Sequence, residues 1–179
     1  MGALLKLSHA VDRLSAGFGW LATVFVLLAV LISAANATVR YLFSYSSNGF
    51  LEIQWYLFGA LFMLGAAHTL RLNQHVRVDI LYGMFSARTK LWVDALGFAL
   101  LFLPVTVTLL VLTSRFFWLS FLQNEASGNA GGLVLWPAKL MLPLGFFLLT
   151  LQGVSELIKR LGALAGDVAV DTRYEKPLQ

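Results

Sequence analysis

The side chains that could perform chemistry in this chain are few. Histidine occurs only at His9, His68 and His75, and the chain contains no cysteine. Without cysteine, disulfides, zinc–thiolate sites and thiol catalysis are excluded. A bis-histidine haem needs two histidines at matching depth. His68 has only His9 as a candidate partner, so a hydrogen-bonded histidine near a helix end is the simpler interpretation.

The charged side chains do not indicate a reaction centre either. Asp94 and Arg115 bound opposite ends of one long apolar segment and cannot meet, while Glu52 and Glu156 lie at the ends of two others. We expect Asp94 to lie beside the basic residues of the preceding loop. The chain carries no phosphate-binding loop, nucleophile elbow or cluster of metal ligands. We therefore expect a protein that is not an enzyme and that binds neither a cofactor nor a metal.

The segments that carry these residues are more apolar than those of soluble domains. Of the 179 residues, 59% are hydrophobic and 12% are charged, whereas soluble domains have about 25% charged residues. The net charge of +4 comes from basic residues that lie between the apolar segments. This pattern is typical of charges that orient a membrane protein, and it argues against a nucleic acid partner. The composition predicts an all-α integral membrane protein whose surroundings are the lipid bilayer.

Four largely apolar segments are long enough to cross a bilayer as helices. The segment Ile53–Leu70 would cover roughly 27 Å as a helix, close to the hydrocarbon thickness of a membrane. The first segment is longer than the roughly 7–15-residue apolar core of a signal peptide, so we expect it to be a span as well. The expected spans lie at about 16–43, 50–71, 91–120 and 134–158, within one membrane domain over residues 1–162.

The remaining segments are short. Residues 3–14 place four aliphatic side chains on one helical face: Leu4, Leu7, Val11 and Leu14. This pattern predicts an amphipathic helix lying on the membrane surface, and a short lead-in to the first span is the alternative. We expect a flexible polar loop at residues 123–132 and a polar tail at residues 163–179.

Three features inside the expected spans affect packing. Ala29, Ser33 and Ala37 recur every four residues, a spacing that lets a neighbouring helix approach closely. Pro104 lies near the middle of the third span, where it removes a backbone hydrogen bond and is expected to kink the helix. Lys139 lies just inside the fourth span, so we expect its long stem to carry the amine to the membrane surface.

The distribution of basic residues predicts that both termini are cytoplasmic, because cytoplasmic segments carry the excess of lysine and arginine. In this orientation only Arg40, Arg115 and Lys139 lie towards the outer side. The other basic residues lie on the cytoplasmic side: Lys6, Arg13, Arg71, Arg77, Arg88, Lys90, Lys159, Arg160, Arg173 and Lys176. Every tryptophan lies near an expected boundary: Trp20 and Trp92 on the inner side, and Trp55, Trp118 and Trp136 on the outer side.

The segment from Glu52 to Asp79 resembles part of the small membrane subunit of TRAP transporters, the tripartite ATP-independent periplasmic carriers. The resemblance rests on Glu52 at the outer start of the second span, on Gly65-Ala66-Ala67, and on His75-Val76-Arg77-Val78-Asp79 after that span. The chain length, the four spans and Leu103-Pro104 agree with it. Family members often have two adjacent acids preceded by a tryptophan, whereas here Gly49-Phe50-Leu51 precede Glu52 and Ile53 follows it.

This resemblance implies a non-catalytic subunit of a multi-pass transporter in the bacterial inner membrane. In such systems a separate large membrane subunit carries the substrate by symport with sodium ions. A periplasmic binding protein delivers the substrate, often an organic acid. The small subunit packs against the static scaffold of the large subunit and broadens its base in the bilayer. Its outer surface is a candidate docking surface for the binding protein.

The resemblance also gives candidate contact residues. His75, Arg77 and Asp79 could form a polar cluster that contacts the partner or lipid phosphates, and a structural turn is the alternative. Glu52 could pair with a basic residue of the partner, or it could stabilise a helix start through the backbone dipole.

Gly65 and Ala66 are candidates for a packing surface on the second span, which a bulky substitution would disrupt. A membrane anchor of a redox enzyme, which would bind haem or a quinone, remains the second functional hypothesis. The two hypotheses differ in whether the chain holds a pigment.

Overall fold

The structure is a computed structural model that describes residues 2–45, 47–74 and 84–167. Its elements are α1 (Gly2–Phe43), α2 (Asn48–Arg71), α4 (Ala87–Gly97), the π-helix η1 (Phe98–Phe102), α5 (Leu103–Leu122) and α6 (Trp136–Leu164). Four helical segments are long and apolar enough to cross a membrane: α1, α2, the continuous α4–η1–α5, and α6. The predictions of an all-helical protein and of four helices of membrane-spanning length are confirmed.

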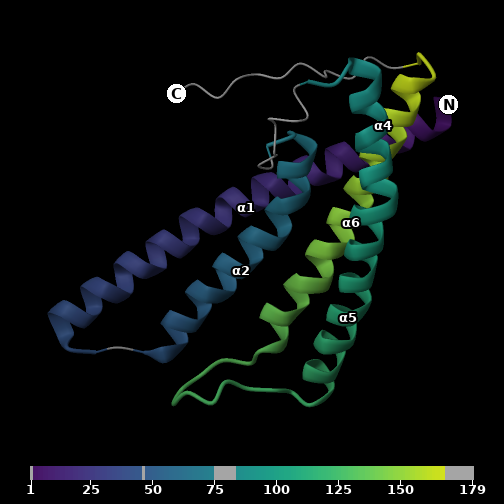
Figure 1. The fold of residues 1–179 in the computed structure, drawn as a ribbon. Coiled ribbons are helices and arrows are strands. Elements are labelled where there is room, and N and C mark those ends of the chain that lie inside the picture. The colour runs from purple at the N-terminus through teal and green to yellow at the C-terminus, as the bar shows by residue number, and fades with distance from the viewer. Residues whose placement is uncertain (1, 46, 75–83, 168–179) are drawn as a thin grey trace.

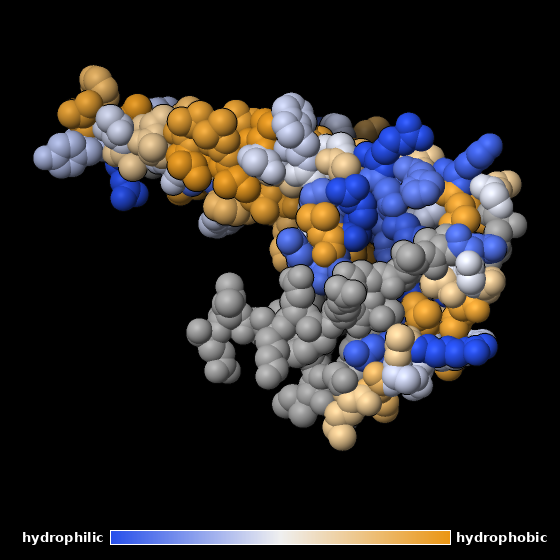
Figure 2. Space-filling model, turned by 90° about the horizontal axis from the view of Figure 1, so that it is seen from above, coloured by the Kyte–Doolittle hydropathy of each residue, from blue (hydrophilic) through white to orange (hydrophobic). Residues whose placement is uncertain are grey.

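Helix α6 is the central element, because it contacts each of the other helical segments named above. Helices α1 and α2 run side by side as a two-helix arm that crosses α6, while α4–η1–α5 lies along α6 (Figure 1). A small core forms where α1, α2 and α6 meet, around Leu64, Ala67 and Leu148. Figure 2 shows the arm as a largely hydrophobic projection, with hydrophilic side chains gathered over the end of the bundle where α1 begins.

Helix α1 continues without a break through residues 3–14. Its 42 residues would extend about 63 Å, roughly twice the hydrocarbon thickness of a bilayer. Its early leucines point outward, since Leu4 is 49% and Leu7 is 54% exposed, whereas Ser8 and Ser15 are buried against α6. The structure therefore does not separate a surface helix from the first span. An apolar outer face with a polar inner face suits a helix that is surrounded by lipid.

A seven-residue repeat of small and polar residues lets α1 pack closely. The side chain is buried at every seventh position from residue 8: Ser8, Ser15, Ala22, Ala29 and Asn36. Of the small-residue series expected from the sequence, Ala29 belongs to this repeat, whereas Ser33 and Ala37 are exposed on the arm. The packing period of α1 is therefore seven residues, which keeps one face on its neighbours.

Pro104 lies two residues after the end of the π-helix η1. Leu103 N–H donates to the carbonyl of Phe98, five residues back, and α5 begins there. A proline cannot donate to the carbonyl four residues before it, and its ring clashes with that carbonyl in a regular α-helix. The wider turn at Phe98–Phe102 accommodates this clash. The expected disturbance near Pro104 thus takes the form of a local π-helix.

Candidate functional site

Glu52 organises the loop end of the bundle, the end that holds the α1–α2 loop and the α5–α6 loop (residues 123–135). Its side chain is buried, with 3% of the residue exposed. Ser127 Oγ and Asn129 Nδ2 donate to Glu52 Oε1, the second at 2.8 Å, and the backbone N–H of Leu133 donates to Oε2 at 2.7 Å. The acid that the resemblance singled out therefore ties α2 to the α5–α6 loop.

The loop that Glu52 holds is itself ordered as a hairpin. Ala126 and Val134 form an isolated β-bridge. Ser127 N donates to Leu133 O at 2.9 Å, and Leu135 N donates to Glu125 O at 2.8 Å. The expectation of a flexible loop is not what the structure shows, because the neutral polar groups of the loop find partners within the hairpin and on α2.

Two more side chains of α2 contact the same loop. Asn48 Nδ2 donates to the carbonyl of Ala130 at 3.0 Å, and Tyr56 Oη donates to the carbonyl of Val134 at 3.2 Å. Together with Glu52 they place donors and an acceptor along more than two turns of α2. The α5–α6 loop is thus a preorganised surface at the loop end.

Lys139 completes the loop end from the side of α6. Its ammonium pairs with the Glu125 carboxylate and lies 4.1 Å from the centroid of the Phe116 ring. The hydrogen bond from Lys139 holds the pKa of the Glu125 carboxyl below its ordinary value. We expected the long stem of Lys139 to carry its amine to the membrane surface. In the structure this amine pairs with the carboxylate of Glu125 in the α5–α6 loop.

A polar network joins α1 to α6 at the terminal end of the bundle, the end where α1 begins and α6 ends. Gln152, which is 0% exposed, lies at its centre. Ser15 Oγ donates to Gln152 Oε1 at 2.7 Å, and Gln152 Nε2 donates to Asp12 Oδ1 at 2.9 Å. Lys159 Nζ donates to the same Asp12 oxygen at 2.8 Å. Both polar atoms of the Gln152 side chain therefore bond to α1, and Asp12 Oδ1 accepts hydrogen bonds from two side chains of α6.

Arg160 extends this network to α4. It is 5% exposed and pairs with Glu156 on its own helix. Its Nε donates to Asp94 Oδ2 at 3.2 Å, and its guanidinium lies 4.8 Å from the centroid of the Phe98 ring. Asp94 thus has a partner on α6 that was not expected from the sequence. One expectation needs correction: Glu156, expected at a helix end, is buried at 6% exposure.

This network was not predicted, because the position of a charged residue along its own span does not show which residues of other helices it faces. The signal was present as polar residues at spacings of three and four on α6. They are Gln152, Ser155, Glu156, Lys159 and Arg160, and the residues that face them on α1 are Ser8, Asp12 and Ser15. A polar stripe at this spacing in an otherwise apolar helix indicates a contact between helices.

The predicted packing residues of α2 are Gly65 and Ala66. A Cβ added at Gly65 would lie 3.6 Å from Ala22 Cβ of α1, which is an ordinary contact, and Ala66 is half-buried. A closer approach occurs at Gly145 of α6, where an added Cβ would lie 2.8 Å from the backbone oxygen of Met63. The structure thus places Gly65 against another helix of its own chain and identifies Gly145 as a tighter contact.

The structure gives each described histidine a different environment. A Cβ added at Gly19 of α1 would lie 2.4 Å from Cγ of His68, so this imidazole occupies the space above a glycine. His9 lies about 15 Å along α1 from Gly19 and is exposed. Among the described residues, no group of three or more histidine, aspartate and glutamate side chains could hold a metal ion. Three predicted motif residues lie outside the described residues: His75, Arg77 and Asp79.

Comparison with known proteins identifies the family of this chain. A search of curated proteins and a search of solved structures return no match. One family profile, described as Tripartite ATP-independent periplasmic transporters, DctQ component, matches residues 29–163. This match runs from the middle of α1 to the last turns of α6 and includes Glu52, Gln152 and Arg160. The chain therefore belongs to the DctQ family, the small membrane component of TRAP transporters.

Proposed function

We propose that the chain is a non-catalytic permease subunit that braces the scaffold of a separate large membrane subunit. That large subunit takes up an organic acid by ion-coupled symport, and a periplasmic binding protein delivers the acid to it. The match of residues 29–163 to the DctQ component carries this proposal. The fold supports it, because the membrane-spanning helices are tied to one another at both ends.

The ties between helices have the character that a brace needs. Glu52 joins α2 to the α5–α6 loop, and Gln152 and Arg160 join α1 and α4 to α6. These polar side chains make their contacts within the chain, and large parts of the outer surface are apolar. A rigid apolar body widens the hydrophobic footprint of the subunit that it binds and so resists tilting in the bilayer.

Both termini lie in the cytoplasm of the bacterial inner membrane in this proposal. The contact between the hydroxyls of Ser8 and Ser155, 2.7 Å apart, brings the start of α1 and the end of α6 to one side. Arg71 ends α2, Arg88 lies in the first turn of α4, and Arg13 follows Asp12 in the part of α1 that contacts Lys159 on this side. The positive-inside rule assigns this side to the cytoplasm. The α5–α6 loop then faces the periplasm, where the binding protein arrives.

The candidate contact residues fit this orientation. Glu52 already accepts hydrogen bonds from its own loop, so we propose that it shapes the surface that meets a partner. His75, Arg77 and Asp79 follow α2 in the sequence and remain our candidates for contact with the large subunit or with lipid phosphates.

Reconstitution tests this function. Liposomes containing the large subunit, with the binding protein and a radiolabelled panel of dicarboxylates and sugar acids outside, should accumulate one of these acids only when this chain is present. Liposomes containing this chain alone should accumulate none. Uptake by the chain alone, or full uptake by the large subunit without it, would overturn the proposed function.

A further inference from the structure

Arg115 is a charged residue in an apolar part of α5. Seven residues follow it in the helix, from Phe116 to Leu122, and all but Ser120 are hydrophobic. Arg115 therefore lies about 10 Å before the end of the helix, within a segment that is long and apolar enough to cross a membrane. Its side chain is exposed, and within residues 2–45, 47–74 and 84–167 it has no ion pair.

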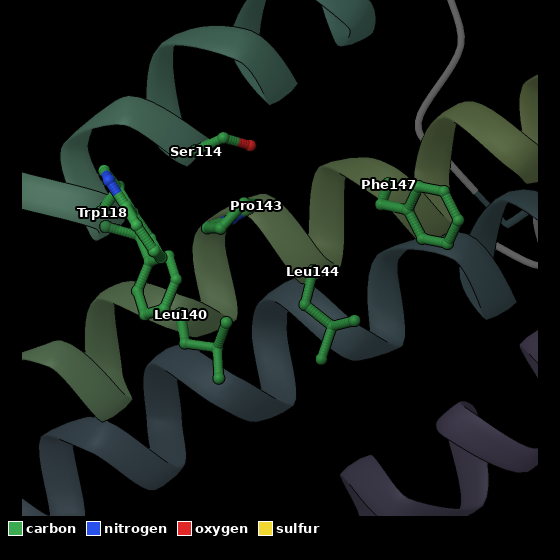
Figure 3. A pocket seen from close by; sticks show the side chains of 7 residues that line it. Ser114, Trp118, Leu140, Pro143, Leu144 and Phe147 are labelled. Atoms are coloured by element: carbon green, nitrogen blue, oxygen red, sulfur yellow. The ribbon is translucent and has the colours of Figure 1, made fainter. Parts of the chain in front are cut away.

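Arg115 points away from the rest of the bundle. Thr106 faces the other helices at 4% exposure, and Arg115 follows it by nine residues, which places it on the opposite side of α5. The side of α5 that faces α6 carries Ser114 and Phe117, which line a groove of about 460 Å³ beside Pro143 (Figure 3). Charged side chains of membrane-spanning helices almost always face the interior of a bundle. The outward direction of Arg115 thus indicates a neighbour outside this chain.

Lys139, a second cation at the same level, is directed differently. Its ammonium lies 4.1 Å from the ring centroid of Phe116 and pairs with Glu125. The Cα–Cβ bonds of a helix tilt towards its N-terminus. Helix α6 begins at the loop end, so Lys139 is tilted towards the loop, whereas α5 ends there, so Arg115 is tilted towards the middle of its helix. We therefore expect the partner of Arg115 at the depth of the hydrocarbon, whereas lipid phosphates lie at the membrane surface.

Arg115 belongs to a stripe of exposed residues on α5. Pro104, Thr108, Val111 and Arg115 follow one another at spacings of four, three and four, and all are exposed. This spacing keeps side chains on one face of a helix, as in helices that pack along their length. Thr108 Oγ1 donates to the carbonyl of Pro104 at 2.8 Å, so this stripe presents small apolar groups and one cation. Another helix can approach a face of small residues closely.

We propose that the α5 stripe (Pro104, Thr108, Val111 and Arg115) packs against the large membrane subunit, and that Arg115 pairs there with a carboxylate of that subunit. The inference rests on the proposed function and adds the helix that carries the contact and the chemistry that the partner supplies. A carboxylate suits Arg115 because the planar guanidinium can donate two parallel hydrogen bonds to it. The pair also removes the cost of leaving a charge in contact with lipid.

Co-purification of the tagged chain with the large subunit in mild detergent tests the proposal. Arg115→Gln should reduce the retained large subunit about tenfold or more, because it leaves the carboxylate of the partner without its cation. Arg40→Gln is the control, since it removes an exposed cation in the last turn of α1 and should retain as much as wild type. Absence of the large subunit from the wild-type preparation would contradict the proposed function itself. Equal retention by wild type and Arg115→Gln would contradict only the role of the α5 stripe.

Charge reversal tests the chemistry of the partner. Arg115→Glu should abolish retention of the large subunit. Mutagenesis of the large subunit should then restore retention through the replacement of an aspartate or glutamate in a membrane-spanning segment by lysine or arginine. Failure of every such replacement would overturn the carboxylate as the partner. Loss of a bound phospholipid from Arg115→Gln, with the large subunit fully retained, would assign Arg115 to a lipid and overturn the proposal.

A pair of substitutions at Val111 tests the packing part of the proposal without changing a charge. Val111 is 62% exposed, so we expect Val111→Trp and Val111→Ala to leave the thermal unfolding of the isolated chain unchanged. Val111→Trp should prevent close approach and reduce retention of the large subunit, whereas Val111→Ala should retain it. Equal retention by the two variants would overturn the α5 stripe as a packing surface.

Discussion

At the scale of single residues, the clearest result concerns Glu52. Its carboxylate is buried at the N-terminal part of α2 and receives donors from Ser127, Asn129 and Leu133. An ion pair with a partner and the stabilisation of a helix start were the two sequence-based interpretations. The structure offers a third, in which Glu52 sets the conformation of a loop 75 to 81 residues away in sequence.

Substituting Glu52→Gln tests this positioning role. The amide keeps the shape but has one oxygen in place of two, so it cannot accept all three hydrogen bonds. We expect hydrogen exchange at the Leu133 amide to become faster by about tenfold or more. Glu125→Gln is the matched control, because it breaks the contact with Lys139 and leaves the bond to Leu133 in place. Unchanged exchange in Glu52→Gln would contradict the role.

The pair of Lys139 and Glu125 predicts a pH dependence. The pKa of Glu125 is lower in the folded protein than its ordinary 4.5, chiefly because Lys139 donates to it. Its stabilising contribution is therefore complete above about pH 4.5 and is lost as the pH falls through the folded-state pKa. Wild type should have a higher Tm than Glu125→Gln at pH 7, and the difference should disappear under acid conditions. A constant Tm difference from pH 7 to pH 3 would contradict this.

At the scale of elements, α6 is the helix against which the others are placed. Its contact with α2 depends on Gly145, since an added Cβ would lie 2.8 Å from the backbone oxygen of Met63. A backbone atom cannot rotate away, so the two helices would have to separate. We expect Gly145→Ala to lower the free energy of unfolding by about 1–3 kcal/mol.

Gly65→Ala is the control for this effect, because its added methyl group would make an ordinary 3.6 Å contact with Ala22. It should change the free energy of unfolding by less than about 0.5 kcal/mol. Reversible unfolding of both variants in mixed micelles makes the comparison. Equal losses of unfolding free energy in the two variants would show that the contact between Gly145 and Met63 is not tight.

The network at the terminal end predicts a larger effect. Arg160→Met leaves Glu156 and Asp94 without the guanidinium that pairs with both. Removing one partner from a buried charge pair costs about 3–5 kcal/mol. Arg88→Met removes an exposed cation of α4 and should cost less than about 0.5 kcal/mol. The same unfolding measurement applies, and equal stability of the two variants would contradict the importance of this network.

The helices themselves could be predicted from the sequence, because each contains a largely apolar segment of about the length that a bilayer requires. The contacts between them could not. Ser15 and Gln152 lie 137 residues apart, and Glu52 and Leu133 lie 81 residues apart. A hydrophobic period locates a helix but does not say which polar residue faces which. The seven-residue repeat of α1 and the polar stripe of α6 can both be seen in the sequence. Only the fold shows that Ser8 and Ser15 of the repeat contact the stripe.

At the scale of the whole molecule, the bundle is closed at its ends and apolar on its sides. The polar side chains join α1, α2, α4 and α6 to one another, and the arm of α1 and α2 presents apolar side chains outward (Figure 2). In a membrane, such a body associates with other membrane proteins mainly through close packing of its apolar side chains. This arrangement fits a subunit that adds width and rigidity to a larger transporter.

Affinity purification of the tagged chain from its native membranes tests that central claim most directly. Mass spectrometry of the purified material should find one much larger multi-pass membrane protein at a constant ratio to this chain. The same pair should persist after mild detergent exchange and size-exclusion chromatography. A stable chain that elutes without any such protein would contradict the claim that it serves as a brace.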